Sequence, residues 1–319
     1  MSSLLLTVLI CTHNRAMLLG KLIASLDAAR CPAEGVEILV VANRCSDGTH
    51  ALLYARAGST AGGPPLRWVA EPVAGKSHAL NRGMPEVRTP LVAFIDDDQR
   101  VDEGYLEAAC QAAREHANAD LFCGRLIPDW DGQEPPWVHD KGRYRIYPLP
   151  TPDFSPGDQP RVLAAGGPLP GGGNLIARTP WLAKVGDFAV DLGPVGHDLG
   201  GAEDYDWLMR ALRLGARLMY VPALLQYHVV EAERLTVGYL MRKAYKRSAG
   251  AIGLHPPASP VDGVPGHAYR KLAGYALSAL TAWRADRRRF YLIRTAAAAG
   301  EIAGYRDLSQ GTGAERKRA

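Results

Sequence analysis

The amino-acid sequence predicts an α/β fold with a doubly wound, mostly parallel sheet, flanking helices and a helical C-terminal extension. Two observations lead to this prediction. Short runs rich in Val, Ile and Leu recur through the first half of the chain without strict alternation, which is typical of parallel strands buried on both faces. Leucines at helical spacing fill the intervals between these runs, and strands that alternate with helices indicate right-handed βαβ units.

The strands expected in the first half lie at residues 5–11, 36–42, 66–70 and 91–95. After the first strand, Leu18, Leu22 and Leu26 mark one apolar helical face, and weaker helical spacing follows the second and third strands. In such sheets, ligands bind beyond the carboxyl ends of the strands. The polar residues that follow each apolar run are therefore the candidate site.

The second half begins with an irregular segment from Trp130 to Pro170 that contains nine prolines. A loop of this length inside a compact domain is usually functional or mobile. Regular patterns return at 180–185 and continue with a helix at 203–214, a short strand at 218–221, a basic helix at 234–249 and one or two helices within 269–305. We expect one domain over residues 1–250, with halves that meet at residue 125, and a basic helical extension over residues 251–319.

Composition and cysteine usage narrow the class of protein. Of the 319 residues, 47% are hydrophobic and 22% are charged, which is ordinary for a soluble globular chain. The five cysteines form no CxxC pair, so we expect reduced thiols in a reducing, cytoplasmic compartment. The apolar runs at 4–11 and 272–283 are too short to span a bilayer, and no basic segment precedes the first, as it would in a signal peptide.

The net charge of +4 is unevenly distributed along the chain. Residues 234–319 contain 16 Lys and Arg against five Asp and Glu, a net charge of +11, so residues 1–233 carry −7. This asymmetry indicates either a polyanionic surface as partner of the extension or a solvated basic face without a partner. Nucleic acid is not expected, because the arginines at 284 and 287–289 accompany no stacking platform or recognisable reader motif.

The sharpest local feature is the acidic triplet Asp96, Asp97 and Asp98 at the end of the fourth expected strand. Three adjacent carboxylates repel one another, and hard divalent cations such as Mg²⁺ or Mn²⁺ bind such groups together with substrate phosphates. Residues 96 and 98 point the same way from a strand end, so both could reach one metal–diphosphate. A solvated acidic turn is the alternative interpretation.

Two further features are candidates for chemistry. Glu203 and Asp204 open an expected helix, where the helix dipole favours acids and also keeps a carboxylate ionised, as a general base requires. His228 follows an expected strand, and it is either a packed or surface side chain or a metal ligand.

These features belong to a set of motifs that occur in a fixed order. The motifs are Thr7–Arg15 (TVLICTHNR), Val40–Thr49 (VVANRCSDGT), Gly75–Gly83 (GKSHALNRG), Phe94–Asp98 (FIDDD), Gly171–Arg178 (GGGNLIAR), Gly201–Trp207 (GAEDYDW) and His228. With this set the chain resembles family 2 glycosyltransferases of the GT-A fold over residues 5–250, and the ordered set is far more specific than any one motif.

The resemblance implies transfer of a sugar, with inversion, from a nucleotide-diphosphate sugar to an acceptor hydroxyl. A UDP-sugar is the first candidate for the donor, and a glycan or lipid-linked molecule is the expected acceptor. The cofactor would be Mn²⁺ or Mg²⁺. The reaction would belong to the biosynthesis of polysaccharides, glycolipids or other glycoconjugates.

The resemblance also implies roles for single residues. Those that bind the nucleotide sugar would be Thr12, Asn14, Arg15, Asn43, Lys76, Asn81, Asp96, Asp97, Gly173 and Asn174. Asp98 would be the principal metal ligand, with Asp96 and His228 beside it. Asp204 would take the proton of the acceptor hydroxyl, and Glu203 would hold the acceptor or share that role. Residues 1–125 would bind the donor, and residues 126–250 would bind the acceptor.

Two positions depart from the family pattern. Asn43 follows Ala42 where an aspartate usually hydrogen-bonds the base, so the base preference is left open. Leu80 replaces an arginine that contacts the diphosphate, and Lys76 or Arg82 would substitute for it. These departures keep a catalytically inactive sugar-binding protein as an alternative. A sugar nucleotidyltransferase is another, but it would have a Gly-rich loop in place of residues 12–15.

The C-terminal extension contains an apolar stripe within Tyr269–Arg294, next to several arginines. The stripe consists of Leu272, Tyr275, Ala276, Ala279, Leu280 and Trp283. One interpretation places it in the headgroup region of an anionic membrane, on the inner face of the cell membrane. The other has it packed on the rest of the protein.

Overall fold

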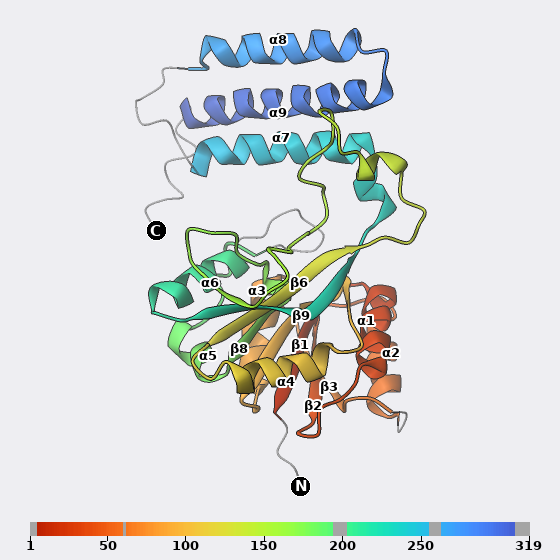
Figure 1. Cartoon of the computed structure of the whole chain (residues 1–319), viewed down its shortest axis with the longest axis vertical. Helices are drawn as coiled ribbons and strands as arrows, with labels where there is room; N and C mark the ends of the chain where they lie inside the picture. Colours follow the sequence, from red (N-terminus) through yellow and green to blue (C-terminus); the bar gives the residue numbers. More distant parts are fainter. Residues whose placement is uncertain (1–4, 60–61, 194–202, 255–262, 310–319) are drawn as a thin grey trace. The chain divides into compact units, whose positions relative to one another are not determined.

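The structure is a computed structural model that describes residues 5–59, 62–193, 203–254 and 263–309. The chain divides into two compact units (Figure 1). The first contains Met1–Asp129 and Pro152–Val229, and the second contains Trp130–Thr151 and Val230–Ala319. The irregular segment expected at 130–170 is thus divided between the two units.

The parallel half of the sheet in the first unit contains the four strands expected from the sequence. These are β1 (Leu6–Thr12), β2 (Val36–Asn43), β3 (Leu66–Glu71) and β4 (Leu91–Asp96). They lie in the order β3-β2-β1-β4, and all neighbouring pairs are parallel. Each strand end falls within one residue of its expected position, which confirms the α/β prediction for this half.

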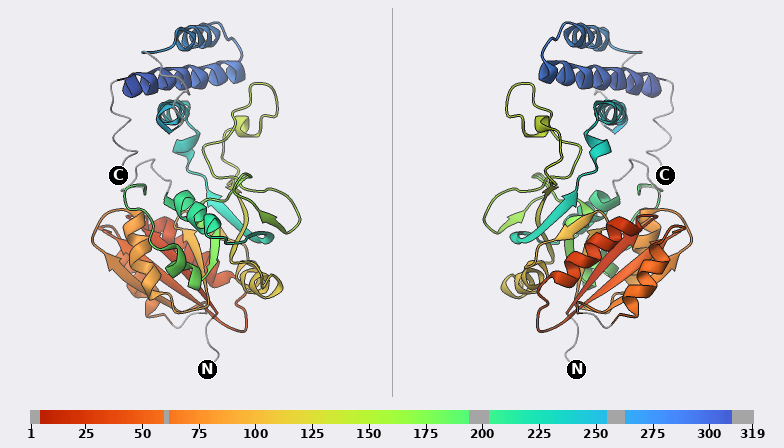
Figure 2. Two further views of the ribbon diagram at one scale, coloured as in Figure 1. Left: turned by 90° about the vertical axis from the view of Figure 1, so that its left-hand side faces the viewer. Right: turned by 90° about the vertical axis from the view of Figure 1, so that its right-hand side faces the viewer.

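Helices cover both faces of this sheet, as the two side views in Figure 2 show. On one face lie α1 (Ala16–Ala28), α2 (Thr49–Ala57) and α4 (Tyr105–Glu115). On the other lie α3 (Lys76–Gly83), followed by η1 (Met84–Glu86), α5 (Pro180–Val185) and α6 (Glu203–Arg213). In β1, Val8 and Ile10 belong to the first core and Leu9 to the second, as the two-residue period of a strand requires.

A second half extends the sheet beyond β4. Its strands are β8 (Leu175–Arg178), β6 (Leu121–Asp129), β9 (Leu218–Val229), β5 (Gln99–Val101) and β7 (Arg161–Leu163), with η3 (Gly172–Asn174) before β8. β8 is antiparallel to both β4 and β6, whereas β6 and β9 are parallel. Both β5 and β7 are antiparallel to β9.

The sequence prediction is incomplete in this second half. The short strand expected at 218–221 continues to Val229, and β6, β8 and α4 are additional elements. Along β9, buried residues alternate with partly exposed ones. The strand therefore lacks the continuous apolar run that marks β1 to β4 in the sequence.

The second unit is helical. Its helices are α7 (Val237–Leu254), α8 (Gly266–Leu280) and α9 (Ala285–Ser309), and α9 lies between the other two (Figure 1). A Cβ atom on Gly300 would collide with the backbone of Tyr245, so this glycine lets α9 approach α7 closely. Because this packing takes all of α7 into the helical unit, the compact units divide after Val229 and the boundary expected at residue 250 falls inside a helix. No helix in the described part of the chain is long and apolar enough to cross a membrane.

Residues 130–151 belong to the helical unit through contacts of their side chains and backbone. η2 (Pro136–His139) places the ring of Trp137 4.9 Å from the guanidinium carbon of Arg289. The ring of Tyr144 lies 5.7 Å from that of Phe290. Lys243 donates a hydrogen bond to the carbonyl oxygen of residue 150, at 3.1 Å. The chain enters this unit again through η4 (Ala232–Leu235), just before α7.

Candidate active site

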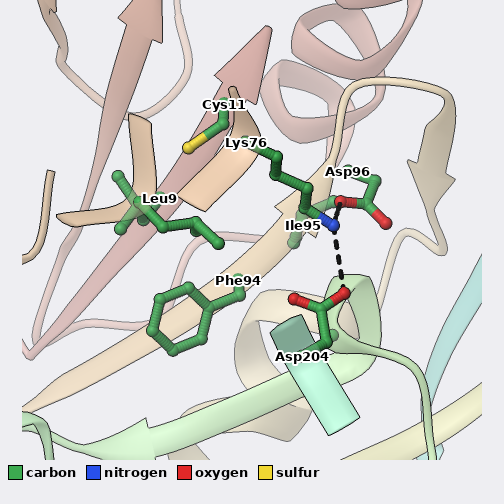
Figure 3. A pocket seen from close by; sticks show the side chains of 9 residues that line it. Leu9, Cys11, Lys76, Phe94, Ile95, Asp96 and Asp204 are labelled. Carbon is green, nitrogen blue, oxygen red and sulfur yellow. Dashed lines mark hydrogen bonds and ion pairs between the residues drawn. The ribbon is translucent and has the colours of Figure 1, made fainter. Parts of the chain in front are cut away.

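Lys76 lies among three carboxylates (Figure 3). Its Nζ atom is 2.8 Å from Oδ1 of Asp96, 3.1 Å from Oδ2 of Asp204 and 3.5 Å from Oε1 of Glu203. Lys76 begins α3, Asp96 ends β4, and the two acids open α6. Residues that are 128 positions apart in the sequence therefore meet beyond the carboxyl ends of the parallel strands, where such sheets bind ligands.

The cluster forms the polar part of a small pocket. Lys76, Asp96 and Asp204 line it together with Leu9, Cys11, Leu80, Phe94, Ile95 and Gly172. Figure 3 shows the Lys76 side chain pointing between the carboxylates of Asp96 and Asp204, with the Phe94 ring and Leu9 beside them. Apolar walls strengthen the attraction between these charges, because charges interact more strongly there than in water.

Burial and charge act in opposite directions on these groups. Burial lowers the pKa of Lys76, but the neighbouring carboxylates hold that pKa well above its ordinary value. Burial raises the pKa of Asp96, and Lys76 then brings that pKa below its usual value. For Glu203, burial and the charge of Asp204 raise the pKa. Its Oε2 atom is buried and has no hydrogen-bond partner among the residues that the structure describes. Lys76 is thus firmly protonated, and Glu203 is the carboxyl group that resists ionisation.

Two glycines of η3 allow the backbone to lie against this cluster. A Cβ atom on Gly172 would overlap the carboxylate of Asp204. A Cβ atom on Gly173 would overlap the carboxylate of Asp96. A Cβ atom on Gly171, by contrast, would meet nothing within 4 Å. The predicted site residue Gly173 therefore lies in the cluster, whereas residues 201 and 202 of the predicted acidic motif lie outside the described residues.

A second charged group surrounds Arg15, just after β1. Its Nη1 atom is 3.0 Å from Oδ1 of Asp97 and 3.2 Å from Oδ2 of Asp98. The hydroxyl group of Thr12 donates a hydrogen bond to Oδ2 of Asp97 at 2.7 Å. Burial raises the pKa of Asp97 to about 6, although Arg15 opposes the shift. These residues meet because β1 and β4 are neighbours in the sheet.

Asp98 also lies beside His228. The N–H of Val229 donates to the carbonyl oxygen of Asp98 at 2.8 Å, which continues the pairing of β5 with β9. The His228 Nε2 atom is 3.4 Å from Oδ1 of Asp98, and its Nδ1 atom is 2.8 Å from the Val229 carbonyl oxygen. A proton on Nδ1 would satisfy that carbonyl and leave the Nε2 lone pair facing Asp98, which is the form in which imidazole binds a metal.

The carboxylate oxygens of Asp96 and Asp98 suit a hard divalent cation, and the imidazole of His228 is a common ligand of divalent transition metals. In the described part of the chain, no three His, Cys, Asp or Glu side chains are arranged so that they could hold a metal ion. The reason is visible in the ion pairs, since Asp96 faces Lys76 while Asp98 faces Arg15 and His228.

Two asparagines that were predicted to bind the donor form hydrogen bonds with the backbone of loops at this edge of the sheet. Asn43 donates to the carbonyl oxygens of residues 71 and 73 and accepts from the N–H of Gly75, at 2.9 Å. It thereby fixes the residue that precedes Lys76. Asn14 has a left-handed conformation with φ of 53°, and its Oδ1 atom accepts a hydrogen bond from the N–H of Ser46 at 2.7 Å.

Two more asparagines that were predicted to bind the donor also form hydrogen bonds with the backbone, deeper in the unit. Asn81 exchanges hydrogen bonds with the N–H and C=O of Phe188, at 2.8 and 2.9 Å. Asn174 does the same with Gly124, at 2.9 and 2.7 Å. Asn81 therefore ties α3 to the segment that precedes α6, and Asn174 ties η3 to β6.

Gln226 and Gln99 are site residues that the sequence did not indicate. The Nε2 atom of Gln226 donates to the carbonyl oxygen of Gly173 at 3.2 Å and to Oε1 of Gln99 at 3.3 Å. Both glutamines are buried, in β9 and β5 respectively. A lone glutamine has no distinguishing pattern in a sequence, and only the full length of β9 would have placed it against η3.

The parallel half-sheet, its mixed extension and the acidic residues beyond β4 define a GT-A fold, a fold of enzymes that use nucleotide sugars. Residues 7–164, just under half of the chain, match the family model described as "Glycosyl transferase family 2", which assigns this part of the chain to that family. It is a nucleotide-sugar-dependent glycosyltransferase. No curated protein sequence matches the chain.

Solved structures with a similar fold share little sequence with the chain. S. aureus TarS is 17% identical with a TM-score of 0.51, and the match covers 97% of this chain but only 55% of that protein. TarS 1-349 in complex with UDP is 16% identical with a TM-score of 0.54, over 97% of this chain and 92% of the other. The mannosyltransferase PcManGT from Pyrobaculum calidifontis, in complex with GDP-Man and Mn²⁺, is 17% identical with a TM-score of 0.54, over 92% and 86%. At these identities the likeness shows the fold.

Proposed function

We propose that the chain transfers a sugar from a nucleotide-diphosphate sugar, in the first place a UDP-sugar, to a hydroxyl group of a glycan or lipid-linked acceptor, with inversion. The observation that carries this proposal is the meeting of Asp96, Glu203 and Asp204 around Lys76. One small pocket thus holds a carboxylate that can accept a proton and a cation that can face a diphosphate. The product would be part of a polysaccharide, a glycolipid or another glycoconjugate.

The metal site of this proposal consists of Asp98, Asp96 and His228, with Mn²⁺ or Mg²⁺ as the ion. The orientation of the His228 ring supports it, because Nδ1 faces a carbonyl oxygen and Nε2 faces Asp98. PcManGT, a protein of the same fold, is described in complex with Mn²⁺. A divalent ion bound there would neutralise the charge that builds up on the diphosphate leaving group. One oxygen of Asp96, Oδ1, is paired with Lys76.

Asp204 is the general base of the proposal. Its side chain is 22% exposed and lines the pocket, whereas that of Glu203 is 2% exposed and its raised pKa disfavours the ionised form. Asp204 accepts the proton of the acceptor hydroxyl while the oxygen attacks the anomeric carbon and the bond to the diphosphate breaks. One such displacement inverts that carbon and needs no nucleophile of the protein. Glu203 would hold the acceptor.

The proposed donor-binding site contains the residues that follow β1 and β2 and those at the start of α3. Arg15 and Lys76 are its cations, and both are paired with carboxylates that a diphosphate could replace. Thr12, Asp97 and Asn14 border Arg15, and the asparagines 43, 81 and 174 hold the loops around Lys76 and Gly173. Solved relatives in fold are described with UDP, UDP-GlcNAc and GDP-Man.

Calorimetric titration of UDP and GDP, with Mn²⁺ and with a chelator, tests the proposal. We expect one nucleoside diphosphate to bind in a metal-dependent manner. Asp98→Ala should weaken that binding at least about tenfold, because the loss of a residue that only orients a metal ligand already costs about 10- to 100-fold in metal affinity. Asp158→Ala is the matched control, because the Asp158 side chain is 90% exposed and remote from the metal ligands in the sequence. Unchanged metal dependence in Asp98→Ala would refute the metal site, and no binding of either nucleotide would refute the donor class.

A further inference from the structure

One face of α8 is apolar and has no partner among the described helices. Leu277 is 63% exposed and Leu280 is 84% exposed, and Trp283, in the turn that leads to α9, is 87% exposed. Tyr269 and Ala273 precede them at the spacing of four residues that keeps side chains on one face of a helix. Large side chains with this exposure, gathered at one helix end, indicate an interaction surface.

The opposite face of α8 anchors the helix to α9. Ala268 and Ala279 are buried there, and the ring of Tyr275 lies 6.1 Å from that of Tyr291. The stripe expected from the sequence is thus divided. Its members Tyr275 and Ala279 pack inside the helical unit, whereas Leu280 and Trp283 do not. Because this face packs on α9, the exposed apolar face of α8 has a fixed orientation within the helical unit.

Basic residues surround this exposed face. Residues 263–294 contain seven Lys and Arg and a single acid, Asp286. Arg284 follows Trp283 directly, is 60% exposed and contacts Asp286 at 2.8 Å. Arg270 and Arg288 are also exposed. The partner of the face therefore has to accept apolar side chains and cations side by side.

We propose that the end of α8 and its turn into α9 bind an anionic lipid bilayer. Leu277, Leu280 and Trp283 would enter the headgroup region, and the arginines would lie near the lipid phosphates. A second copy of the chain fits the surface less well, because two such faces would bring the exposed arginines 270, 284 and 288 of each copy together. The proposal goes beyond glycosyl transfer, since it assigns a membrane surface to α8 and to its turn into α9.

Co-sedimentation of the full chain with phospholipid vesicles tests this proposal. Vesicles of phosphatidylcholine alone are compared with vesicles that also contain phosphatidylglycerol, each at low and high salt. We expect binding to the anionic vesicles that falls at high salt. The double variant Leu280→Ser, Trp283→Ser should bind at least about tenfold more weakly, because it loses most of the apolar surface that enters the membrane. Arg284→Ala and Arg288→Ala should each lose about fivefold.

Leu214→Ser is the matched control, since Leu214 is a 48% exposed leucine of the first unit. It should bind vesicles as the wild type does. Equal binding to neutral and anionic vesicles, or wild-type binding by the double variant, would overturn the proposal. A dimer of the wild type that the double variant abolishes would assign the face to self-association instead. Nucleotide titration of the double variant separates this test from the proposed function, because its nucleotide affinity should equal that of the wild type.

Discussion

The ammonium group of Lys76 connects Asp204 with Asp96, at 3.1 and 2.8 Å. One cation thus neutralises both the carboxylate assigned as the base and a carboxylate assigned to the metal. A donor diphosphate that draws Lys76 towards itself would release the two carboxylates together. We infer that donor binding and activation of the base are coupled through this side chain.

Replacement of Lys76 by Met should destabilise the protein at neutral pH, because it leaves three carboxylates facing one another. The free energy of unfolding should fall by an amount between the ~1 kcal/mol of an exposed ion pair and the ~3–5 kcal/mol of a buried one, since the Lys76 side chain is 22% exposed. Denaturant unfolding with a chelator measures it. Lys21→Met, at an exposed lysine of α1, is the matched control and should have no effect.

The difference in the free energy of unfolding between Lys76→Met and Lys21→Met should depend on pH. The pKa of Lys76 is raised on folding, so its contribution is complete below about pH 10 and disappears as the pH rises through the folded pKa. The pKa of Asp96 is lowered, so its contribution is complete above about pH 4 and disappears as the pH falls through the folded pKa. The two variants should therefore differ most between these limits. A difference that stays constant as the pH falls towards about 3 would contradict this interpretation.

Gly172→Ala should lower turnover while nucleotide binding persists. The added Cβ would overlap the carboxylate of Asp204 and push it out of place, and a displacement of about 1 Å at a reacting group can cost up to a hundredfold. Gly171→Ala adds the same methyl group one residue earlier, where it meets nothing within 4 Å. Steady-state kinetics of both variants provide the comparison. Equal turnover in the two would show that the close approach to Asp204 is unimportant.

Asn43→Ala should destabilise the fold and leave the preference between UDP and GDP unchanged. It removes the hydrogen bonds to residues 71, 73 and 75, and each buried group left unpaired costs about 1–3 kcal/mol. Asn118→Ala, at an exposed asparagine, serves as the control for thermal unfolding. A changed ratio of UDP to GDP affinity would instead assign Asn43 to the base, as the family resemblance implies.

Much of the parallel half of the fold can be predicted from the sequence, since strands buried on both faces leave apolar runs. β1, β2 and β4 are recognised in this way, whereas β3 is an edge strand in which only Leu66 is fully buried. β9 is recognised only at its start, because its later residues alternate between buried and partly exposed positions and include the glutamine and histidine that face the site.

The candidate site shows a similar division. Motif order singles out Asp96, Asp98, Asp204 and His228, and the structure brings them to one edge of the sheet. The sequence does not indicate that Lys76 binds the carboxylates, because an ion pair across 128 positions depends on how α3 and α6 pack. Nor does it indicate that the asparagines bind backbone groups, since an amide has the same letter in a ligand site and in a loop.

The most direct test of the proposed function compares Asp204→Asn with Glu203→Gln. The measurement is the rate of sugar transfer from the nucleotide sugar that binds best, together with the affinity for its nucleoside diphosphate. Asp204→Asn should lower turnover by about a hundredfold to ten-thousandfold, the usual contribution of a positioned base, and retain nucleotide affinity. Glu203→Gln should lose less, because Glu203 is buried and its raised pKa disfavours the carboxylate. Wild-type turnover in Asp204→Asn, or a larger loss in Glu203→Gln, would contradict the assignment of the base.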